Sequence, residues 1–343
     1  MRRFALKYIL LRTISSVFAV VFIALNLWLW GISPAEITLS QPLLPYAMLF
    51  GFQAFLFSYF GFLIADGLSR FWWNRWRPAT SESVAMDSIV IHIPGWREIH
   101  GLLYHDRDLI GPGQGFIILS YGYNDNQFRA RHIASGLAVA GFYVFVWDYR
   151  GREGTKGRIT DLGGHLDDLT QVISFWQDHL PVPGSQIFIA GWSLGGTLSI
   201  IAGLQDPRVA RVFAWSAWFD LRRNVLWRIY ANPFALLRYL LKGELLTTSK
   251  RVNEIVSPRY VLQHLALDLG GMDRVQGLAA EKLFLCHARD DKLVGFENFR
   301  YNKDMLHLGN HNTYVFSKGA HFLIRSEPAV LGMIYRFFTE ERR

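Results

Sequence analysis

The sequence predicts an α/β fold with a mostly parallel central sheet, preceded by two apolar helices at the N-terminus. From about residue 88 onward, short β-branched or aromatic segments alternate with longer helical ones, which implies crossover connections between parallel strands. Two of the expected strands, FIILS and IFIA, are almost continuously apolar, as is typical of strands covered on both faces. The first 65 residues contain two long stretches without a charge, which predict the two helices.

The composition excludes several classes of protein. The 343 residues are 51% hydrophobic, 15% aromatic and 19% charged, whereas a disordered chain would be poor in aromatics and rich in charge. A single cysteine, Cys286, excludes a disulfide framework and any multi-thiolate metal site. The mean hydropathy of +0.14 is high for a soluble protein and indicates that part of the chain lies in lipid.

The apolar surplus is concentrated near the N-terminus. Residues 13–32 and 43–65 are 20 and 23 residues long and carry no charge. As helices they would be about 30 and 34 Å long, enough to cross the hydrocarbon core of a bilayer. The connecting residues 33–42 contain two prolines and no basic residue. We therefore expect a transmembrane helical hairpin.

Charges beside the two stretches predict their orientation. Seven basic residues flank the pair on its outer sides: Arg2, Arg3, Lys7, Arg12, Arg70, Arg75 and Arg77. The positive-inside rule then places both ends of the hairpin in the cytoplasm, with residues 1–77 as a membrane anchor in contact with lipids. A cleaved signal peptide over residues 1–33 is one alternative, although no A-x-A site follows its apolar core. Two buried helices of a soluble protein are the other.

Residues 78–343 are expected to form one α/β domain. The expected strands are Ser88–Ile93, Glu98–Tyr104, Phe116–Ser120, Phe142–Trp147, Ile187–Ala190, Arg211–Trp215, Lys282–Cys286 and Asn312–Phe316. The expected helices are Gln127–Ala140, Gly164–His179, Leu194–Gln205, Phe296–Leu306 and Pro328–Thr339. Residues 217–276 break the alternation, because no strand is evident there and sixty residues are too many for a plain connection. This segment has nine basic and five acidic residues and is interpreted as a helical lid, either lying at a membrane surface or packed on the domain.

The motif Gly191-Trp192-Ser193-Leu194-Gly195 carries the clearest chemical signal. It follows the expected strand IFIA and begins the next helix. A turn that raises a serine hydroxyl above a sheet must be very tight, and only small residues two positions before and after the serine leave room for it. Gly191 and Gly195 meet this requirement, so Ser193 is the candidate nucleophile.

A serine needs a base, and that base needs a carboxylate to orient it. Asp290 and Asp291 follow the expected strand 282–286, and His321 follows the last strand. The carboxyl ends of parallel strands share one edge of a sheet, so these side chains can meet Ser193 there. Asp220, which follows the strand 211–215, is an alternative acid.

An oxyanion intermediate requires two backbone N–H donors near the serine. Leu194, which directly follows Ser193, would supply one donor. The second is expected from the loop after FIILS, where Gly122 allows close approach of the backbone and Tyr123 offers its N–H.

Four motifs together resemble the α/β-hydrolase superfamily, and in particular its membrane-anchored serine esterases, lipases and thioesterases. They are GWSLGG at the nucleophile, SYGYNDN at the oxyanion loop, WDYRGREGTKG after the next strand, and HARDDKLV at the acid. The resemblance runs from about residue 88 to the C-terminus, and residues 217–276 do not match. It implies the chain order Ser193, Asp291, His321 and favours Asp291 over Asp290, because Asp291 stands four residues after His287 in the family's H-G-x-x-D-x-x-V loop.

The chain departs from the family pattern at four positions. Tyr121 stands where a histidine is usual in the oxyanion loop, and Ala288 replaces a glycine of the acid loop. Glu153 and Thr155 replace a glycine and a serine in the loop after Asp148. None of these changes removes a candidate catalytic residue, but the first bears on the shape of the oxyanion hole.

Three further polar residues are interpreted as structural. Asp148 is expected to anchor the loop 149–157, His287 to end a strand, and Cys286 to be a small buried side chain.

The expected function is cleavage of an ester or thioester, on a lipid-like or acylated substrate, by a membrane protein whose catalytic domain is cytoplasmic. The implied chemistry needs no metal and no organic cofactor. The excess of basic residues is assigned to membrane lipids and not to nucleic acid. The alternatives are an acyltransferase or a serine peptidase on the same triad, and a non-catalytic membrane scaffold with a hydrolase fold.

Overall fold

The computed structural model describes residues 53, 56, 83–95, 97–108, 113–123, 125, 127–226, 249–323 and 326–340. The chain divides between residues 77 and 78, and all described residues except the first two belong to the second part. The expected helices at 13–32 and 43–65 therefore lie outside the described residues, apart from Gln53 and Leu56. Across the described ranges, no helix combines the length and the apolar character that a membrane span requires.

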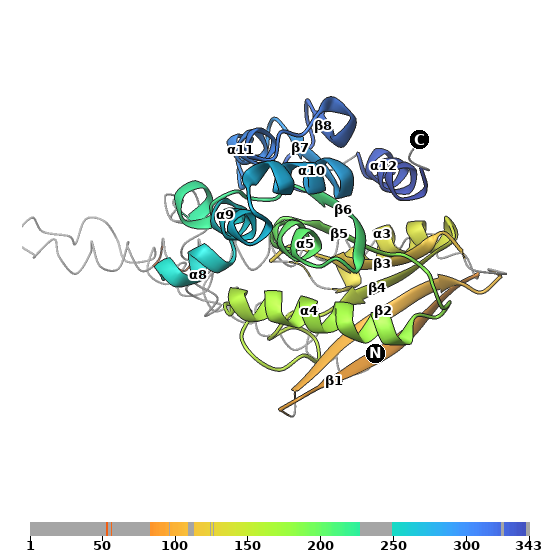
Figure 1. Cartoon of the computed structure of the whole chain (residues 1–343). Helices are drawn as coiled ribbons and strands as arrows, with labels where there is room; N and C mark the ends of the chain where they lie inside the picture. The colour runs from red at the N-terminus through yellow and green to blue at the C-terminus, as the bar shows by residue number, and fades with distance from the viewer. Residues whose placement is uncertain are drawn as a thin grey trace, which may run out of the picture. The chain divides into compact units, whose positions relative to one another are not determined.

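An eight-stranded sheet forms the centre of the domain (Figure 1), with the strands in the order β1-β2-β4-β3-β5-β6-β7-β8. The strands are β1 (Val84–Ile93), β2 (Arg97–Asp106), β3 (Gly115–Ser120), β4 (Phe142–Trp147), β5 (Ile187–Trp192), β6 (Val209–Trp215), β7 (Leu283–Ala288) and β8 (Thr313–Phe316). The pairs β1–β2 and β2–β4 are antiparallel, and all the remaining strand pairs are parallel. The expectation of a mostly parallel sheet is thus confirmed.

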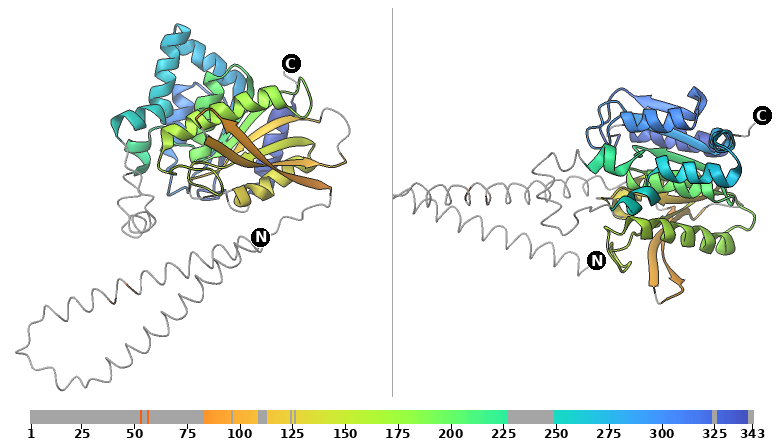
Figure 2. Two further views of the ribbon diagram at one scale, coloured as in Figure 1. Left: turned by 90° about the horizontal axis from the view of Figure 1, so that it is seen from below. Right: turned by 60° about the vertical axis from the view of Figure 1, so that its left-hand side comes forward.

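Helices cover both faces of this sheet (Figures 1 and 2). On one face, α3 (Gln127–Val139) packs against α12 (Glu327–Thr339). On the other face, α5 (Leu194–Gln205) contacts α4 (Leu162–His179), α9 (Pro258–Leu269) and α10 (Met272–Lys282). All six residues of β3 and of β5 are buried as a result, which explains why these two strands are apolar throughout.

Some strand limits differ from the expected ones. Lys282 ends α10 instead of starting a strand, and β7 begins at Leu283. The strand β1 begins four residues earlier than expected, at Val84, because its largely exposed first half pairs with β2 residue by residue. The partner strand is the next one along the chain, so β1 and β2 form a hairpin whose register extends back to Val84 opposite Asp106.

The described part of the segment between β6 and β7 is helical. After the short turn of π-helix Arg222–Leu226, the described chain resumes at residue 249 and forms α8 (Lys250–Ile255), α9 and α10. The end expected for the lid, residue 276, falls inside α10, which packs on β6 and β7 and so belongs to the layer that covers the sheet. Further along the described chain, α11 (Glu297–Met305) lies beside β7, and a single turn of 3-10 helix, Asn310–Asn312, precedes β8.

Candidate active site

Ser193 occupies a strained turn between β5 and α5. Its backbone angles are φ 57° and ψ −119°, a region that side-chain-bearing residues rarely adopt. Hydrogen bonds hold the turn in place, because the Ser193 N–H donates to the carbonyl of Trp215 at 3.0 Å and the Gly195 N–H donates to the carbonyl of Tyr121 at 3.1 Å. The expected sharp strand-to-helix turn is therefore present at this serine.

Close backbone contacts explain why glycine stands at positions 191 and 195, on either side of Ser193. A Cβ atom on Gly195 would lie 2.0 Å from the carbonyl oxygen of Ser120. A Cβ atom on Gly191 would lie 2.6 Å from the carbonyl carbon of Gly195. Both distances are far below van der Waals contact with backbone that cannot move aside, so no larger residue fits at either position.

The structure brings His321 and Asp291 together. Nδ1 of His321 lies 2.8 Å from Oδ2 of Asp291, and both residues are buried, with 6% and 5% of their surface exposed. The other carboxylate oxygen, Oδ1, accepts hydrogen bonds from the N–H groups of Leu293 and Val294, each at 2.9 Å. The acid is thus fixed on both oxygens and points one of them at the imidazole.

His287 supplies a further contact to the same carboxylate. Its Nε2 lies 2.8 Å from the carbonyl oxygen of Val294 and 3.3 Å from Oδ2 of Asp291. Because a carbonyl only accepts, this nitrogen must carry a proton. Burial alone would raise the pKa of Asp291, but the hydrogen bonds from His287 and His321 outweigh burial and hold that pKa well below its usual range. The carboxylate is therefore ionised at neutral pH.

The loop that carries His321 is fixed at two more points. Oδ1 of Asp290 accepts a hydrogen bond from the N–H of Ala320 at 2.8 Å, and Oγ of Ser216 donates to the carbonyl oxygen of His321 at 2.8 Å. Ala320 has a left-handed φ of 50°, so these bonds support a strained backbone. Neighbouring aspartates thus divide the work, with Asp291 on the ring and Asp290 on the backbone.

Ser193 Oγ makes no hydrogen bond to any described residue. Its side chain is 7% exposed, and its pairing with Nε2 of His321 stays a prediction.

The expected oxyanion donors lie at the ends of β3 and β5. Leu194 is the first residue of α5, so its N–H is not needed for hydrogen bonding within the helix. Tyr123 lies in the loop after β3, where its carbonyl oxygen accepts a hydrogen bond from Nη2 of Arg152 at 3.2 Å. Their joint action on an oxyanion also stays a prediction.

Tyr121, which stands where the family usually has a histidine, is completely buried. Its hydroxyl donates to Oδ1 of Asp148 at 2.9 Å and accepts from the N–H of Tyr149 at 3.2 Å. The hydroxyl of Tyr149 in turn donates to the Tyr121 carbonyl at 2.6 Å. The ring therefore anchors the start of the oxyanion loop in the core.

Asp148 holds Tyr121 more directly than it holds the loop 149–157. That loop is anchored by Arg150, whose Nε and Nη2 donate to Asp168 at 2.6 and 2.9 Å and whose Nη1 donates to Asp161. Burial raises the pKa of Asp148 to about 7, so this carboxyl is partly protonated at neutral pH.

Two other candidate residues have different surroundings. Asp220 accepts hydrogen bonds from Arg259, Tyr260 and Asn253, and so connects the end of β6 to the helices α8 and α9. The acid beside His321 is Asp291 instead. Burial raises the pKa of the Cys286 thiol, which makes it a poor nucleophile.

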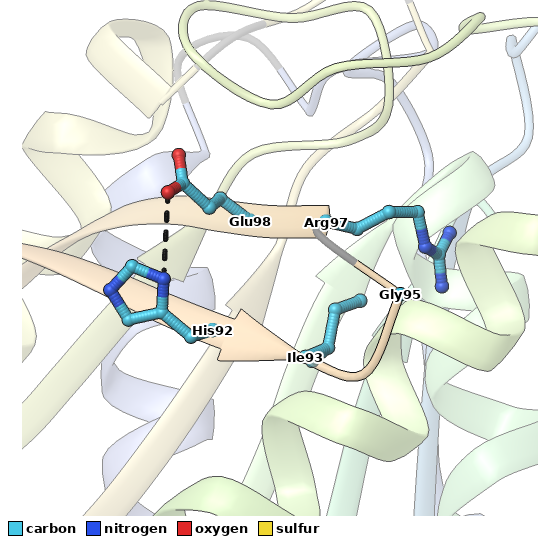
Figure 3. Close-up of a pocket in the computed structure, with 5 residues that line it drawn as sticks. All are labelled: His92, Ile93, Gly95, Arg97 and Glu98. Atoms are coloured by element: carbon cyan, nitrogen blue, oxygen red, sulfur yellow. Dashed lines mark ion pairs between the residues drawn. The ribbon is translucent and has the colours of Figure 1, made fainter.

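A cavity of about 300 Å³ lies at the turn between β1 and β2, lined by His92, Ile93, Gly95, Arg97 and Glu98 (Figure 3). Figure 3 shows His92 paired with Glu98 across the ribbon, while Arg97 points away from both. None of the expected site residues lines this cavity.

Sequence reasoning missed three residues around the site. They are Ser216, which holds the His321 carbonyl, and Asp125 and Trp192, which bond to each other. Asp125 and Trp192 do lie within two motifs that were singled out, but no signal pairs residues that stand 67 positions apart.

The family match identifies a hydrolase of the α/β-hydrolase superfamily. Residues 111–327 match the hydrolase family described as serine aminopeptidase, S33. This match covers more than half of the chain, so the chain belongs to that family. The resemblance expected from the four motifs is confirmed at the level of the superfamily.

The similarity to individual curated relatives is low and covers only part of each protein. The chain is 28% identical over 100 residues to the monoglyceride lipase homolog of Monkeypox virus, and 28% identical over 148 residues to the uncharacterized peptidase YtmA of Bacillus subtilis. These alignments cover 28% and 42% of this chain, and 35% and 56% of the two relatives. The chain thus matches about a third and about half of their lengths.

Solved structures show the same fold. An esterase of Pyrococcus furiosus superposes with a TM-score of 0.57 at 18% identity, covering 74% of this chain and 90% of the esterase. At this level of identity the likeness concerns the fold alone.

Proposed function

We propose that this chain is a serine hydrolase that cleaves an ester or thioester bond through Ser193, His321 and Asp291. The observation that supports the proposal most strongly is the 2.8 Å contact between His321 Nδ1 and Asp291 Oδ2. A buried, ionised carboxylate can only accept, so Nδ1 carries a proton and a neutral ring has Nε2 free to act as a base.

The proposed reaction has two steps. Ser193 Oγ attacks the substrate carbonyl carbon while its proton passes to Nε2 of His321, and the leaving group departs with that proton. Water then attacks the acyl-serine, again giving its proton to Nε2, and the acid product leaves as Oγ regains a proton. The N–H groups of Leu194 and Tyr123 stabilise the negative oxygen formed in each step.

A lipid-like or acylated substrate fits the chain best. The apolar stretches 13–32 and 43–65 would hold the enzyme at a membrane, with the catalytic domain on the cytoplasmic side. One relative is named a monoglyceride lipase homolog, which agrees with such a substrate. Alkaline carbonate extraction of the full chain tests the anchor, and protease protection in sealed vesicles tests the orientation. Release of the full chain by carbonate would contradict the anchor.

A serine peptidase is the second candidate. The description of the family and the name of the Bacillus subtilis relative favour it. The same nucleophile would then attack an amide carbonyl, and His321 would protonate the leaving amine.

One panel of substrates separates these functions. Purified full-length protein is assayed on p-nitrophenyl esters of increasing chain length, on acyl thioesters and on aminoacyl p-nitroanilides, with Ser193→Ala as control. We expect hydrolysis of esters or thioesters that Ser193→Ala abolishes. Turnover of the anilides alone would favour the peptidase, and products formed only with an added alcohol or amine would favour the acyltransferase. A folded protein inert to the whole panel would support the scaffold.

A further inference from the structure

Asp125 and Trp192 join the oxyanion loop to the nucleophile turn. Oδ2 of Asp125 accepts a hydrogen bond from Nε1 of Trp192 at 2.8 Å. Both residues are buried, with 5% and 4% of their surface exposed. Asp125 belongs to the loop after β3, whereas Trp192 directly precedes Ser193 in the chain. This bond therefore connects the two segments that are proposed to supply the oxyanion donors.

The backbone of Asp125 acts on the same loop. Its N–H donates to the carbonyl oxygen of Gly122 at 2.9 Å. That carbonyl and the N–H of Tyr123 belong to one peptide group. The group is planar and trans, so its C=O bond and its N–H bond point in opposite directions. Fixing the direction of the Gly122 carbonyl therefore fixes the direction of the Tyr123 N–H.

Gly122 is packed directly on the bond between Asp125 and Trp192. A Cβ atom at this position would lie 3.0 Å from both Asp125 Oδ2 and Trp192 Nε1. The peptide that follows Gly122 is thus held against a side-chain pair whose other end belongs to the nucleophile turn. Trp192 itself is held by stacking on Trp215, with ring centroids 5.2 Å apart.

We propose that Asp125 is a positioning residue, which uses its backbone N–H to orient the Tyr123 N–H and its carboxylate to fix that donor relative to Ser193 through Trp192. This inference rests on the proposed function, because it assigns a purpose to the expected oxyanion donor. Asp125 touches no reacting atom. Its loss should therefore weaken transition-state stabilisation and leave substrate binding nearly intact.

The test compares four variants with wild type on the ester that wild type hydrolyses fastest. Asp125→Ala and Trp192→Phe each remove one partner of the bond, and we expect each to lower kcat about 10- to 100-fold with KM within about threefold of wild type. Asp125→Asn keeps an acceptor oxygen and should stay within about fivefold of the wild-type kcat. The kcat of the double variant Asp125→Ala/Trp192→Phe should be no more than about twofold below the kcat of the less active single variant.

Trp176→Phe is the matched control. Trp176 is also a buried indole, and its Nε1 has no acceptor among the described residues. Trp176→Phe therefore removes no hydrogen bond among the described residues, and the kcat of this variant should equal that of wild type. Thermal melts of every variant show whether the protein is folded at the assay temperature, and Asp125→Asn and Trp192→Phe keep the test open if Asp125→Ala does not fold.

The outcomes separate the two proposals. Suppose that the wild type is active but that Asp125→Ala has an unchanged kcat, or that the fold-loss of kcat in the double variant equals the product of the two single losses. Either result would overturn the role of Asp125 and leave the proposed function standing. A wild type whose activity equals that of Ser193→Ala would overturn the proposed function, and the role of Asp125 with it.

Discussion

Oδ1 of Asp290 accepts a hydrogen bond from the N–H of Ala320 at 2.8 Å, one residue before the proposed catalytic base. The neighbouring Asp291 contacts the ring of His321 through Oδ2. Two consecutive carboxylates thus hold two consecutive residues of another loop, and their side chains should have unequal importance for catalysis.

Substitution of the two aspartates tests this division. Asp291→Asn can present an amide N–H to Nδ1 and so favour the wrong tautomer of His321, and we expect kcat to fall about 10³- to 10⁴-fold. Asp290→Asn keeps an acceptor for the Ala320 N–H and should lose no more than about threefold. Steady-state kinetics of both variants on one ester provide the comparison. Losses of similar size would contradict the assignment of Asp291 as the acid.

His287 should stabilise the ionised form of Asp291. His287→Leu removes one donor to Oδ2 and leaves the carbonyl of Val294 without its partner, so we expect unfolding to become easier by about 1–3 kcal/mol at pH 7. His287→Gln keeps an N–H donor and should lose less.

The acid sensitivity of the same variant follows from linkage. The folded-state pKa of Asp291 lies below the unfolded value, so its stabilising contribution is complete above about pH 4 and is lost as the pH falls further. In His287→Leu the folded-state pKa moves up, and the contribution becomes smaller. Urea unfolding from pH 3 to 7 measures both effects. A stability curve parallel to that of wild type, displaced by less than about 0.5 kcal/mol, would refute them.

Asp148 should lower stability at alkaline pH. Burial raises its pKa to about 7, so the folded state binds a proton that the unfolded state has already released between about pH 4 and 7. This penalty is absent at low pH and grows to at most about 4 kcal/mol above pH 7. Asp148→Asn has no charge to bury and keeps an acceptor for the Tyr121 hydroxyl. We expect its stability relative to wild type to improve from pH 5 to pH 8 in urea titrations, whereas a constant difference would argue against the raised pKa.

Gly195 should tolerate no side chain. In Gly195→Ala the new Cβ would meet the carbonyl oxygen of Ser120 at 2.0 Å, so we expect a loss of about 3 kcal/mol or more, or failure to fold. Gly277→Ala in α10 is the control, since no atom lies within 4 Å of its Cβ position and helix propensity favours alanine by about 0.5–1 kcal/mol. Thermal unfolding of both variants gives the comparison, and a Gly195→Ala protein as stable as wild type would contradict the described turn.

The sequence predicted those parts of the fold and the site that depend on local pattern. The helix Leu194–Gln205 has the expected bounds, because the Gly-x-Ser-x-Gly turn and the polar residue after Gln205 mark both of its ends. The placement of Asp291 and not Asp290 beside His321 agrees with the spacing of the acid-loop motif.

Contacts between distant segments could not be predicted in this way. Ser216 and His321 stand 105 positions apart in the chain. Tyr121 anchors the oxyanion loop through Asp148, which directly follows β4. These contacts depend on which strands are neighbours and on how each loop leaves the sheet. The order of the strands places β7 between β6 and β8, and in this arrangement Ser216, at the end of β6, reaches the loop after β8 that carries His321.

The central claim is that Ser193 is an activated nucleophile, and covalent labelling tests it most directly. Intact full-length protein is treated with a fluorophosphonate, and its mass is measured before and after, with peptide mapping of the adduct and with Ser193→Ala and His321→Ala as controls. We predict a single adduct on Ser193 in the wild type, none in Ser193→Ala and strongly slowed labelling in His321→Ala. A folded wild-type protein that gains no adduct, or gains it at another residue, would contradict the account.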